Sequence, residues 1–136
     1  MSKENGVVIT SAVRTAIGDL GGSLKNVSAH KLGSTAISSA IEKSNIKASD
    51  INEIIMGQVL TGGAGQNPAR QAAMDAGIPK ETPSYVVNQV CGSGLRSIAS
   101  GYHSILSGNS NKIGRAHVWT PVTDVSRMPS SAWKKK

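Results

Sequence analysis

The sequence contains no phenylalanine and only one cysteine, Cys91, among its 136 residues. A single cysteine excludes an internal disulfide, so its thiol is either buried and inert or used chemically. No apolar run approaches the roughly 18 residues that a membrane span needs. The amino terminus also lacks the apolar stretch of a secretory signal. We therefore expect a soluble, cytoplasmic protein with no membrane partner.

Acidic residues are scarce only towards the carboxyl end. The net charge is +7, but from Lys112 onward six basic residues accompany a single acid, Asp124, which assigns +5 to that segment. Residues 1–111 hold nine basic and seven acidic residues and are nearly balanced. This part of the chain lacks the positive field that nucleic-acid binding requires, so we expect no nucleic-acid partner.

The segment from residue 112 to 136 differs from everything before it. Both tryptophans, Trp119 and Trp133, lie in it, and it shows no hydrophobic periodicity. The stretches 112–123 and 126–133 resemble, in one reading frame, a translated short-read sequencing adapter with TGA read as tryptophan. The three final lysines fit a poly-A run. We interpret residues 112–136 as an unstructured, non-native tail and expect the natural protein to continue differently after Asn111.

Residues 1–111 alternate between strand and helix patterns. β-branched and apolar runs predict strands over 6–10, 51–56 and 84–90. Apolar residues at helical spacing predict helices over 29–43, over 68–76 and from Leu95 onward, with Ser28 and Asn67 as amino-terminal caps and Gly77 as a stop signal. Three strand–helix pairs in succession imply parallel strands with right-handed crossovers. The sequence predicts an α/β domain with a mostly parallel sheet.

Cys91 occupies the position with the clearest chemical potential. It lies where the third predicted strand turns sharply into the third helix, in the run Cys91-Gly92-Ser93-Gly94. We expect the two glycines to permit that turn. The first free amides of the helix would point towards the cysteine, favouring a thiolate and able to hold a developing oxyanion. Cys91 is thus a candidate nucleophile.

The residues from Asn88 to Leu95 resemble the acyl-enzyme signature of the thiolase family. Three other stretches, 8–18, 55–57 and 65–73, resemble the opening segments of thiolases in the same order and spacing. The resemblance covers residues 6–111. It implies that these residues form a partial thiolase amino-terminal domain with the thiolase fold, truncated before the second half.

The resemblance also implies an activity, that of an acetyl-CoA C-acetyltransferase. Cys91 would accept an acyl group from an acyl-CoA substrate, and a second acetyl-CoA would then attack as a carbanion to give acetoacetyl-CoA, or the reverse thiolysis would occur. Thiolases use no metal or redox cofactor, so coenzyme A thioesters would be substrates only. The intact enzyme would be a homodimer or homotetramer.

Thiolases need further groups that this chain does not supply. They use a histidine to activate the cysteine, a second cysteine as acid and base, and an asparagine at an oxyanion, all in their carboxy-terminal half. We therefore do not assign such roles to His30 or His103, and expect the fragment alone to be inactive. We leave three polar residues outside the catalytic set because they fit loop and cap structure equally well: Arg14, Asn67 and Arg70. For Arg70 we favour a role in an interface or ion pair over contact with CoA phosphates.

Two other hypotheses stay open. The chain could be a noncatalytic small basic module that binds nucleic acid or a membrane through its tail, which would make that binding sensitive to salt. A ketoacyl synthase would share the fold and the cysteine nucleophile, but its flanking motifs differ from those in this sequence.

Overall fold

The computed structural model describes residues 6–117. In chain order its elements are α1 (Ala29–Ser44), a short 3-10 turn η1 (Ala48–Asp50), β1 (Glu53–Gly57), α2 (Pro68–Asp75), β2 (Ser84–Val87), α3 (Ser93–Leu106) and β3 (Ile113–His117). None of the helices within this range is long and apolar enough to cross a membrane.

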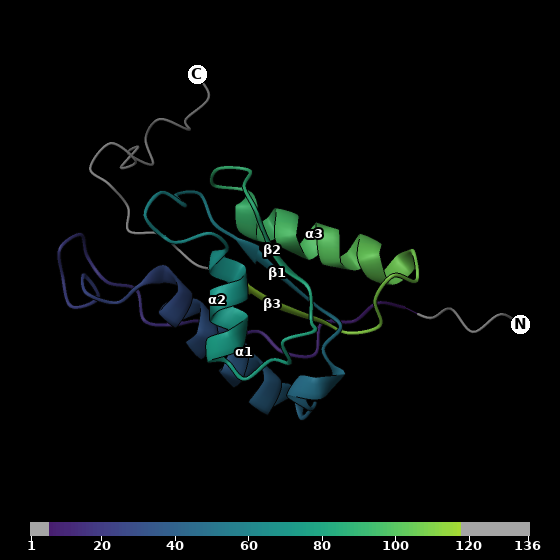
Figure 1. Cartoon of the computed structure of the whole chain (residues 1–136). Helices are drawn as coiled ribbons and strands as arrows, with labels where there is room; N and C mark the ends of the chain where they lie inside the picture. The colour runs from purple at the N-terminus through teal and green to yellow at the C-terminus, as the bar shows by residue number, and fades with distance from the viewer. Residues whose placement is uncertain (1–5, 118–136) are drawn as a thin grey trace, which may run out of the picture.

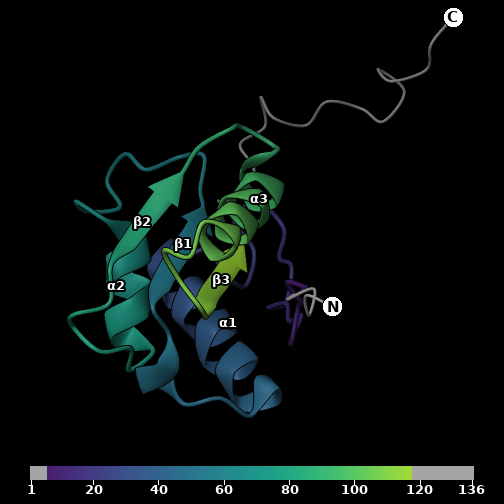
Figure 2. The ribbon, with the colours of Figure 1, turned by 90° about the vertical axis from the view of Figure 1, so that its right-hand side faces the viewer.

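The three strands form one parallel sheet in the order β2-β1-β3. Helices α1 and α2 pack together on one face of the sheet and α3 covers the other, so β1 lies at the centre of three layers (Figures 1 and 2). Parallel strands need crossover connections, and helices on both faces supply them. The predicted α/β class with a mostly parallel sheet is confirmed.

The core is built around β1. Ile54 and Met56 are buried in the same cluster as Ile37 of α1 and Ala69 and Ala73 of α2. Ile55 is fully buried and lies outside that cluster. Because neighbouring side chains of a strand point to opposite faces, Ile55 lies on the side that α3 covers. A strand buried on both faces reads as a continuous apolar run, as Ile54-Ile55-Met56 does.

Helix α2 begins and ends where the sequence predicts. The Asn67 side chain accepts a hydrogen bond from the Arg70 amide at 3.0 Å, with Pro68 at the first helical position. Gly77 follows the helix with a φ of +76°, the left-handed conformation that glycine adopts without strain. At α1 the predicted cap residue, Ser28, occupies the cap position but does not form the cap hydrogen bond. Its hydroxyl lies 3.2 Å from His30 Nε2.

The prediction of a strand over residues 6–10 is wrong. These residues adopt no regular secondary structure, and Val8 and Ile9 are both more than 70% exposed, at 74% and 73%. A strand needs a free edge for its backbone groups. Both edges of β1 are occupied, by β2 and β3, and residues 6–10 do not pair with the free outer edge of either of these strands.

The prediction of an unstructured segment starting at residue 112 is wrong for Ile113–His117. These residues form β3, whose Ile113 pairs with Glu53 of β1. Asn52 holds the residues just before β3 in place. Its side-chain oxygen accepts hydrogen bonds from the amides of Asn111 and Lys112 at 3.1 and 3.0 Å, and its own amide donates to the Lys112 carbonyl. Residues 118–136 lie outside the described residues, so the non-native origin of the tail stays a prediction.

An ion pair between Asp50 and Lys112 joins η1 to the start of β3. Their carboxylate and ammonium atoms are 3.0 Å apart. The hydrogen bond from Lys112, and then its charge, lower the pKa of Asp50 below its usual value of 3.8. A lowered carboxyl pKa contributes stability that is complete above the unfolded value and is lost as the pH falls through the folded one.

We predict that the attachment of β3 weakens as the pH is lowered below 3.8. Hydrogen exchange of the Asn52 amide, which donates to the Lys112 carbonyl, measures this after correction for intrinsic exchange. In Asp50→Asn the protection of this amide should be lower at neutral pH and should lose its dependence on pH in this acidic range. An unchanged pH profile in that variant would show that the ion pair does not hold the strand.

Candidate active site

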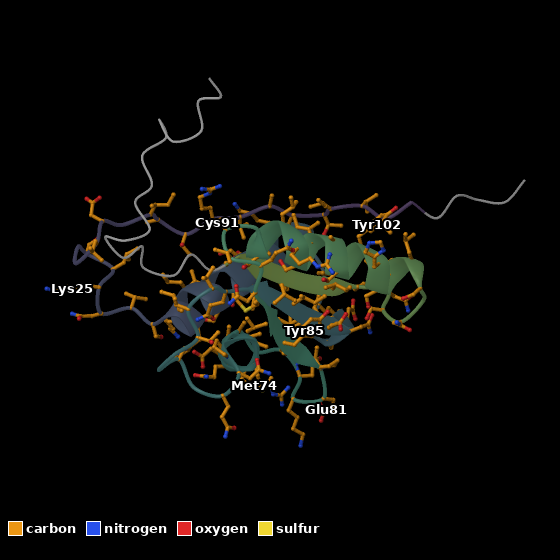
Figure 3. The ribbon with its side chains drawn as sticks, turned by 90° about the horizontal axis from the view of Figure 1, so that it is seen from above. Lys25, Met74, Glu81, Tyr85, Cys91 and Tyr102 are labelled. Atoms are coloured by element: carbon orange, nitrogen blue, oxygen red, sulfur yellow. The ribbon has the colours of Figure 1, made fainter. Side chains whose placement is uncertain are left out.

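Cys91 lies in the short connection between β2 and α3, at the carboxyl end of the sheet, and its residue is exposed to solvent (Figure 3). The connection runs beside the loop that follows β1. The Gln58 amide donates to the Val87 carbonyl at 3.1 Å, and Asn88 Nδ2 donates to the Val59 carbonyl at 3.0 Å. Cys91 is therefore held at the edge of a parallel sheet, where α/β folds commonly bind ligands.

The bend at Cys91 differs from the turn that the sequence predicts. Gly92 has a φ of −85° and a ψ of −1°, which any residue can adopt. The left-handed residue is Val90, with a φ of +48°. The amides of Gly92 and Ser93 donate to the carbonyls of Gln89 and Val90 at 2.9 and 3.1 Å. The glycines therefore do not supply the left-handed turn, and their function must lie elsewhere.

Glycine is instead required where α3 meets the sheet. A Cβ atom at Gly57, the last residue of β1, would lie 2.5 Å from the backbone carbon of Ser93 and 2.7 Å from the Gly94 nitrogen. The face of α3 that contacts the sheet consists of the small buried residues Ser93, Gly94, Ser97 and Gly101. Backbone therefore packs directly on backbone, and this contact sets the position of the first turn of α3 and of the cysteine before it.

The amides of that first turn divide into two groups. Those of Gly92 and Ser93 are engaged within the bend. Among the described residues, the first helix amides without a backbone acceptor are those of Gly94 and Leu95. Orphan amides at a helix amino terminus attract negative charge. The predicted oxyanion donors are thus narrowed to these two amides, and their role stays a prediction.

The large apolar residues of α3 point away from the sheet. Leu95 is 73% exposed, and Tyr102 and Leu106 are also exposed. An open concavity of about 1600 Å³ extends from α3, past Ile113 and Gly114 of β3, to α1 on the other face of the sheet. It is lined largely by the segment before α1, and Cys91 and Ile98 are among its lining residues. The nucleophile candidate therefore opens onto a wide, mainly apolar concavity, the kind of surface on which acyl groups can be accommodated.

Among the side chains that the structure describes, none that is basic forms a hydrogen bond or ion pair with the Cys91 thiol. His103 lies twelve residues along the chain, roughly 18 Å at the rise of an α-helix, and its ring packs edge-on against Tyr102 at 5.6 Å. His30 Nε2 on α1 lies 3.8 Å from an Asp75 carboxylate oxygen on α2. Within residues 6–117, no group of three histidine, cysteine, aspartate or glutamate side chains could hold a metal.

The polar residues of the 65–73 motif have structural contacts. The Arg70 guanidinium donates to the carbonyls of Thr82 and Lys80 at 3.0 and 2.6 Å. Asn67 Nδ2 donates to the Ser84 carbonyl at 2.9 Å, so its side chain caps α2 and also ties it to β2. Arg70 thus connects α2 to the loop before β2. This supports a structural role for Arg70 over contact with CoA, although its partners are backbone carbonyls and not the acid of an ion pair.

Sequence reasoning missed the roles of Gly57 and Asn88. For Ser93 it favours a role in the turn over that of a nucleophile, and the hydroxyl does bind the bend, at the Gln89 amide and the Val90 carbonyl. Gly57 stood in a family-like motif, but only its distance to Ser93 shows why a side chain is excluded there. The signal for Asn88 was present in principle, since asparagine two residues before a turn residue often binds that residue's amide. It does so here, at 2.9 Å from the Val90 nitrogen.

Comparison with known proteins agrees with this architecture. Residues 7–113 match the family model described as thiolase, N-terminal domain. The chain is 50% identical over 107 residues to an acetyl-CoA acetyltransferase of Shinella zoogloeoides, which covers 79% of this chain and 27% of the relative. It is also 50% identical over 105 residues to a probable acetyl-CoA acyltransferase of Staphylococcus aureus, covering 77% of this chain and 27% of that relative.

The fold has a close counterpart among solved structures. A thiolase from Ascaris suum, determined in complex with coenzyme A, superimposes with a TM-score of 0.74 at 39% identity, over 75% of this chain and 27% of that one. The chain thus spans about a quarter of the length of the relatives it matches. The predicted thiolase-like fold, as part of an amino-terminal domain, is confirmed. Neither comparison tests Cys91 as the catalytic residue, which stays a prediction.

We predict that Gly57→Ala destabilises the domain by about 1–3 kcal/mol, the usual cost of overpacking, because the new methyl group meets backbone that cannot rotate away. Gly62→Ala is the matched control, since a Cβ there meets nothing within 4 Å. Urea unfolding followed by circular dichroism should show a lower midpoint for the first variant only. Equal midpoints would mean that α3 is not seated on β1 as described.

Proposed function

We propose that Cys91 is the acyl acceptor of an acyl-CoA acyltransferase, on the premise that this chain belongs to the thiolase family. The observation that most supports the proposal is the placement of the only cysteine. It is exposed at the carboxyl end of the sheet, directly before the first turn of α3, and it opens onto the apolar concavity. Further support comes from the Ascaris suum thiolase, a relative whose structure was solved in complex with coenzyme A.

The proposed step is a thioester exchange. The Cys91 thiolate attacks the carbonyl carbon of an acyl-CoA, the new Sγ–C bond forms, and the C–S bond to coenzyme A breaks with its electron pair leaving on the coenzyme A sulfur. The negative charge on the carbonyl oxygen would be held by the free amides of Gly94 and Leu95. One thioester replaces another, so the step is close to balanced and readily reversible.

The whole reaction, in this proposal, is that of an acetyl-CoA C-acetyltransferase. A second acetyl-CoA, deprotonated at its methyl carbon, attacks the acetyl-cysteine and releases acetoacetyl-CoA, or the same steps run backward as thiolysis. The acid, base and oxyanion groups for this stage belong to the carboxy-terminal half of thiolases. Metals and redox cofactors play no part, and the full-length protein would work in the cytoplasm as a homodimer or homotetramer.

The alternative of a basic binding module has less support. Residues 7–113 are accounted for by a catalytic domain family. Of the basic residues in the predicted tail, Lys112 is already paired with Asp50. Most of the others lie beyond residue 117, outside the described residues, so salt-sensitive binding through them stays a prediction.

We predict that labelled acetyl-CoA acetylates Cys91 of this chain slowly, because the histidine that activates the cysteine in thiolases lies in their carboxy-terminal half, and that the chain does not turn over acetoacetyl-CoA. Proteolysis and mass spectrometry locate the label, and the acetyl group should be removed by added coenzyme A because the exchange is reversible. Cys91→Ala should abolish labelling. Cys91→Ser keeps the size of the side chain and should label at least about a hundredfold more slowly, because a hydroxyl without a base is a poor nucleophile.

Two results would contradict this account. Label on another residue, or undiminished labelling of Cys91→Ala, would remove Cys91 from its role. Measurable thiolysis of acetoacetyl-CoA by the purified chain would show that groups within it replace the missing acid and base.

A further inference from the structure

Val90 is held in a conformation that its own side chain disfavours. Its φ is +48°, in the left-handed region where β-branched residues are rarely found. The clash of Cβ with the neighbouring backbone makes such a residue costly unless its surroundings enforce it. The Val90 side chain is 64% exposed. Burial of this side chain therefore does not compensate for the strain, and other contacts must do so.

Two polar side chains bind the backbone of Val90 from either side. Asn88 Oδ1 accepts its amide at 2.9 Å, and Ser93 Oγ donates to its carbonyl at 2.6 Å. The Ser93 hydroxyl also accepts the Gln89 amide at 2.9 Å. Both backbone polar groups of Val90 are thus occupied, and both partners are themselves anchored. Ser93 is fully buried against Gly57, and Asn88 is tied to the Val59 carbonyl.

Val90 immediately precedes Cys91, so its backbone angles set the direction in which the thiol leaves the bend. A change of Val90 from the left-handed to the extended region would rotate the following peptide and carry the thiol away from the first turn of α3. Positioning of a nucleophile to within a fraction of an ångström governs its reactivity in an enzyme site. The strained residue therefore directly precedes the candidate nucleophile, and its backbone conformation sets the orientation of the Cys91 thiol.

We propose that Ser93 and Asn88 are positioning residues that hold Val90 in its left-handed conformation and thereby orient the Cys91 thiol. The consequence for acyl transfer rests on the proposed function, whereas the effect on the bend does not. Ser93 is not a nucleophile in this account. Its hydroxyl proton is directed at the Val90 carbonyl, and the residue acts on the reaction only through the backbone.

The test uses the full chain with Ser93→Ala, Val90→Gly and the double variant. The readout of the bend is hydrogen exchange of the Gly92 amide, whose acceptor, the Gln89 carbonyl, is unchanged in all of them. Ser93→Ala removes two hydrogen bonds, to the Val90 carbonyl and from the Gln89 amide, and should lower the protection of the Gly92 amide at least about tenfold. Val90→Gly should raise the protection in both backgrounds, because glycine adopts a positive φ without strain.

The sign of the Val90→Gly effect is decisive. In an unstrained bend glycine would lower protection, because it adds freedom to the open state. Lower protection in Val90→Gly, or an unaltered value in Ser93→Ala, would overturn the proposal. If Ser93→Ala does not fold, the protection of the Gly92 amide is compared instead between Asn88→Ala and Asn88→Asp. Aspartate keeps an acceptor for the Val90 amide and loses the donor to Val59, so only alanine should loosen the bend.

A second measurement separates this proposal from the proposed function. Acetylation of Cys91 by acetyl-CoA should slow about tenfold in Ser93→Ala and recover most of its rate when Val90→Gly is added, since the competent bend is populated again. Alkylation by iodoacetamide, which needs an accessible thiolate but no bound acyl-CoA, reports any change in thiolate fraction, and acetylation should fall by more than alkylation does. If wild-type chain is not acetylated, the exchange data still decide the role of Ser93, and the same labelling of a full-length protein that carries the activating histidine decides the proposed function. If acetylation slows in Ser93→Ala and does not recover when Val90→Gly is added, Ser93 serves packing and does not act through Val90.

Discussion

The close contact between Gly57 and the backbone of Ser93 constrains the rest of the site. Because β1 ends in a residue without a side chain, the first turn of α3 can rest directly on the sheet. That contact fixes where the helix begins, and hence where the bend before it must lie. The small residues along the inner face of α3 continue the same packing towards Gly101. A side chain at Gly57 would lift the first turn of the helix and displace the cysteine with it, whereas a Cβ at Gly101 would meet only the Ile113 side chain at ordinary contact distance.

The inner packing of α3 also explains its outer face. A helix that uses glycine and serine against the sheet must carry its large apolar residues on the opposite side, where Leu95, Tyr102 and Leu106 are exposed. Of these, Leu95 and Tyr102 line the concavity onto which Cys91 opens, together with α1 and the segment before it. Close backbone packing on one side of the helix and an apolar concavity on the other are thus two results of one distribution of residue sizes.

Sequence patterns predicted the elements that depend on local rules. α1 and α2 occupy their predicted ranges within a residue or two, and α2 carries its predicted Asn67 cap. The bend at Cys91 was also placed correctly between β2 and α3. These features follow from periodicity and from residues that act within a few positions of themselves.

The remaining features depend on partners distant in the chain, which a single sequence does not show. Apolar spacing predicted the helix that became α3 but not which face it buries. The close approach of Gly57 selects the small-residue face, and Leu95 and Tyr102 are exposed. The run at 6–10 has strand composition but no free edge beside β1, where Ile113–His117 pair. The sharp turn was attributed to the two glycines, but its left-handed residue is Val90, whose backbone is bound by the Asn88 and Ser93 side chains.

The placement of Cys91 beside the loop after β1 is the central claim, and the single cysteine makes it directly measurable. A nitroxide attached to Cys91 broadens nearby amide signals in a proton–nitrogen spectrum. We expect the strongest broadening at Gln58, Val59 and Gly94, and little at Ile51, which lies roughly 23 Å from Gln58 at the rise of a strand. Uniform broadening along β1, or none at Gln58 and Val59, would contradict the account.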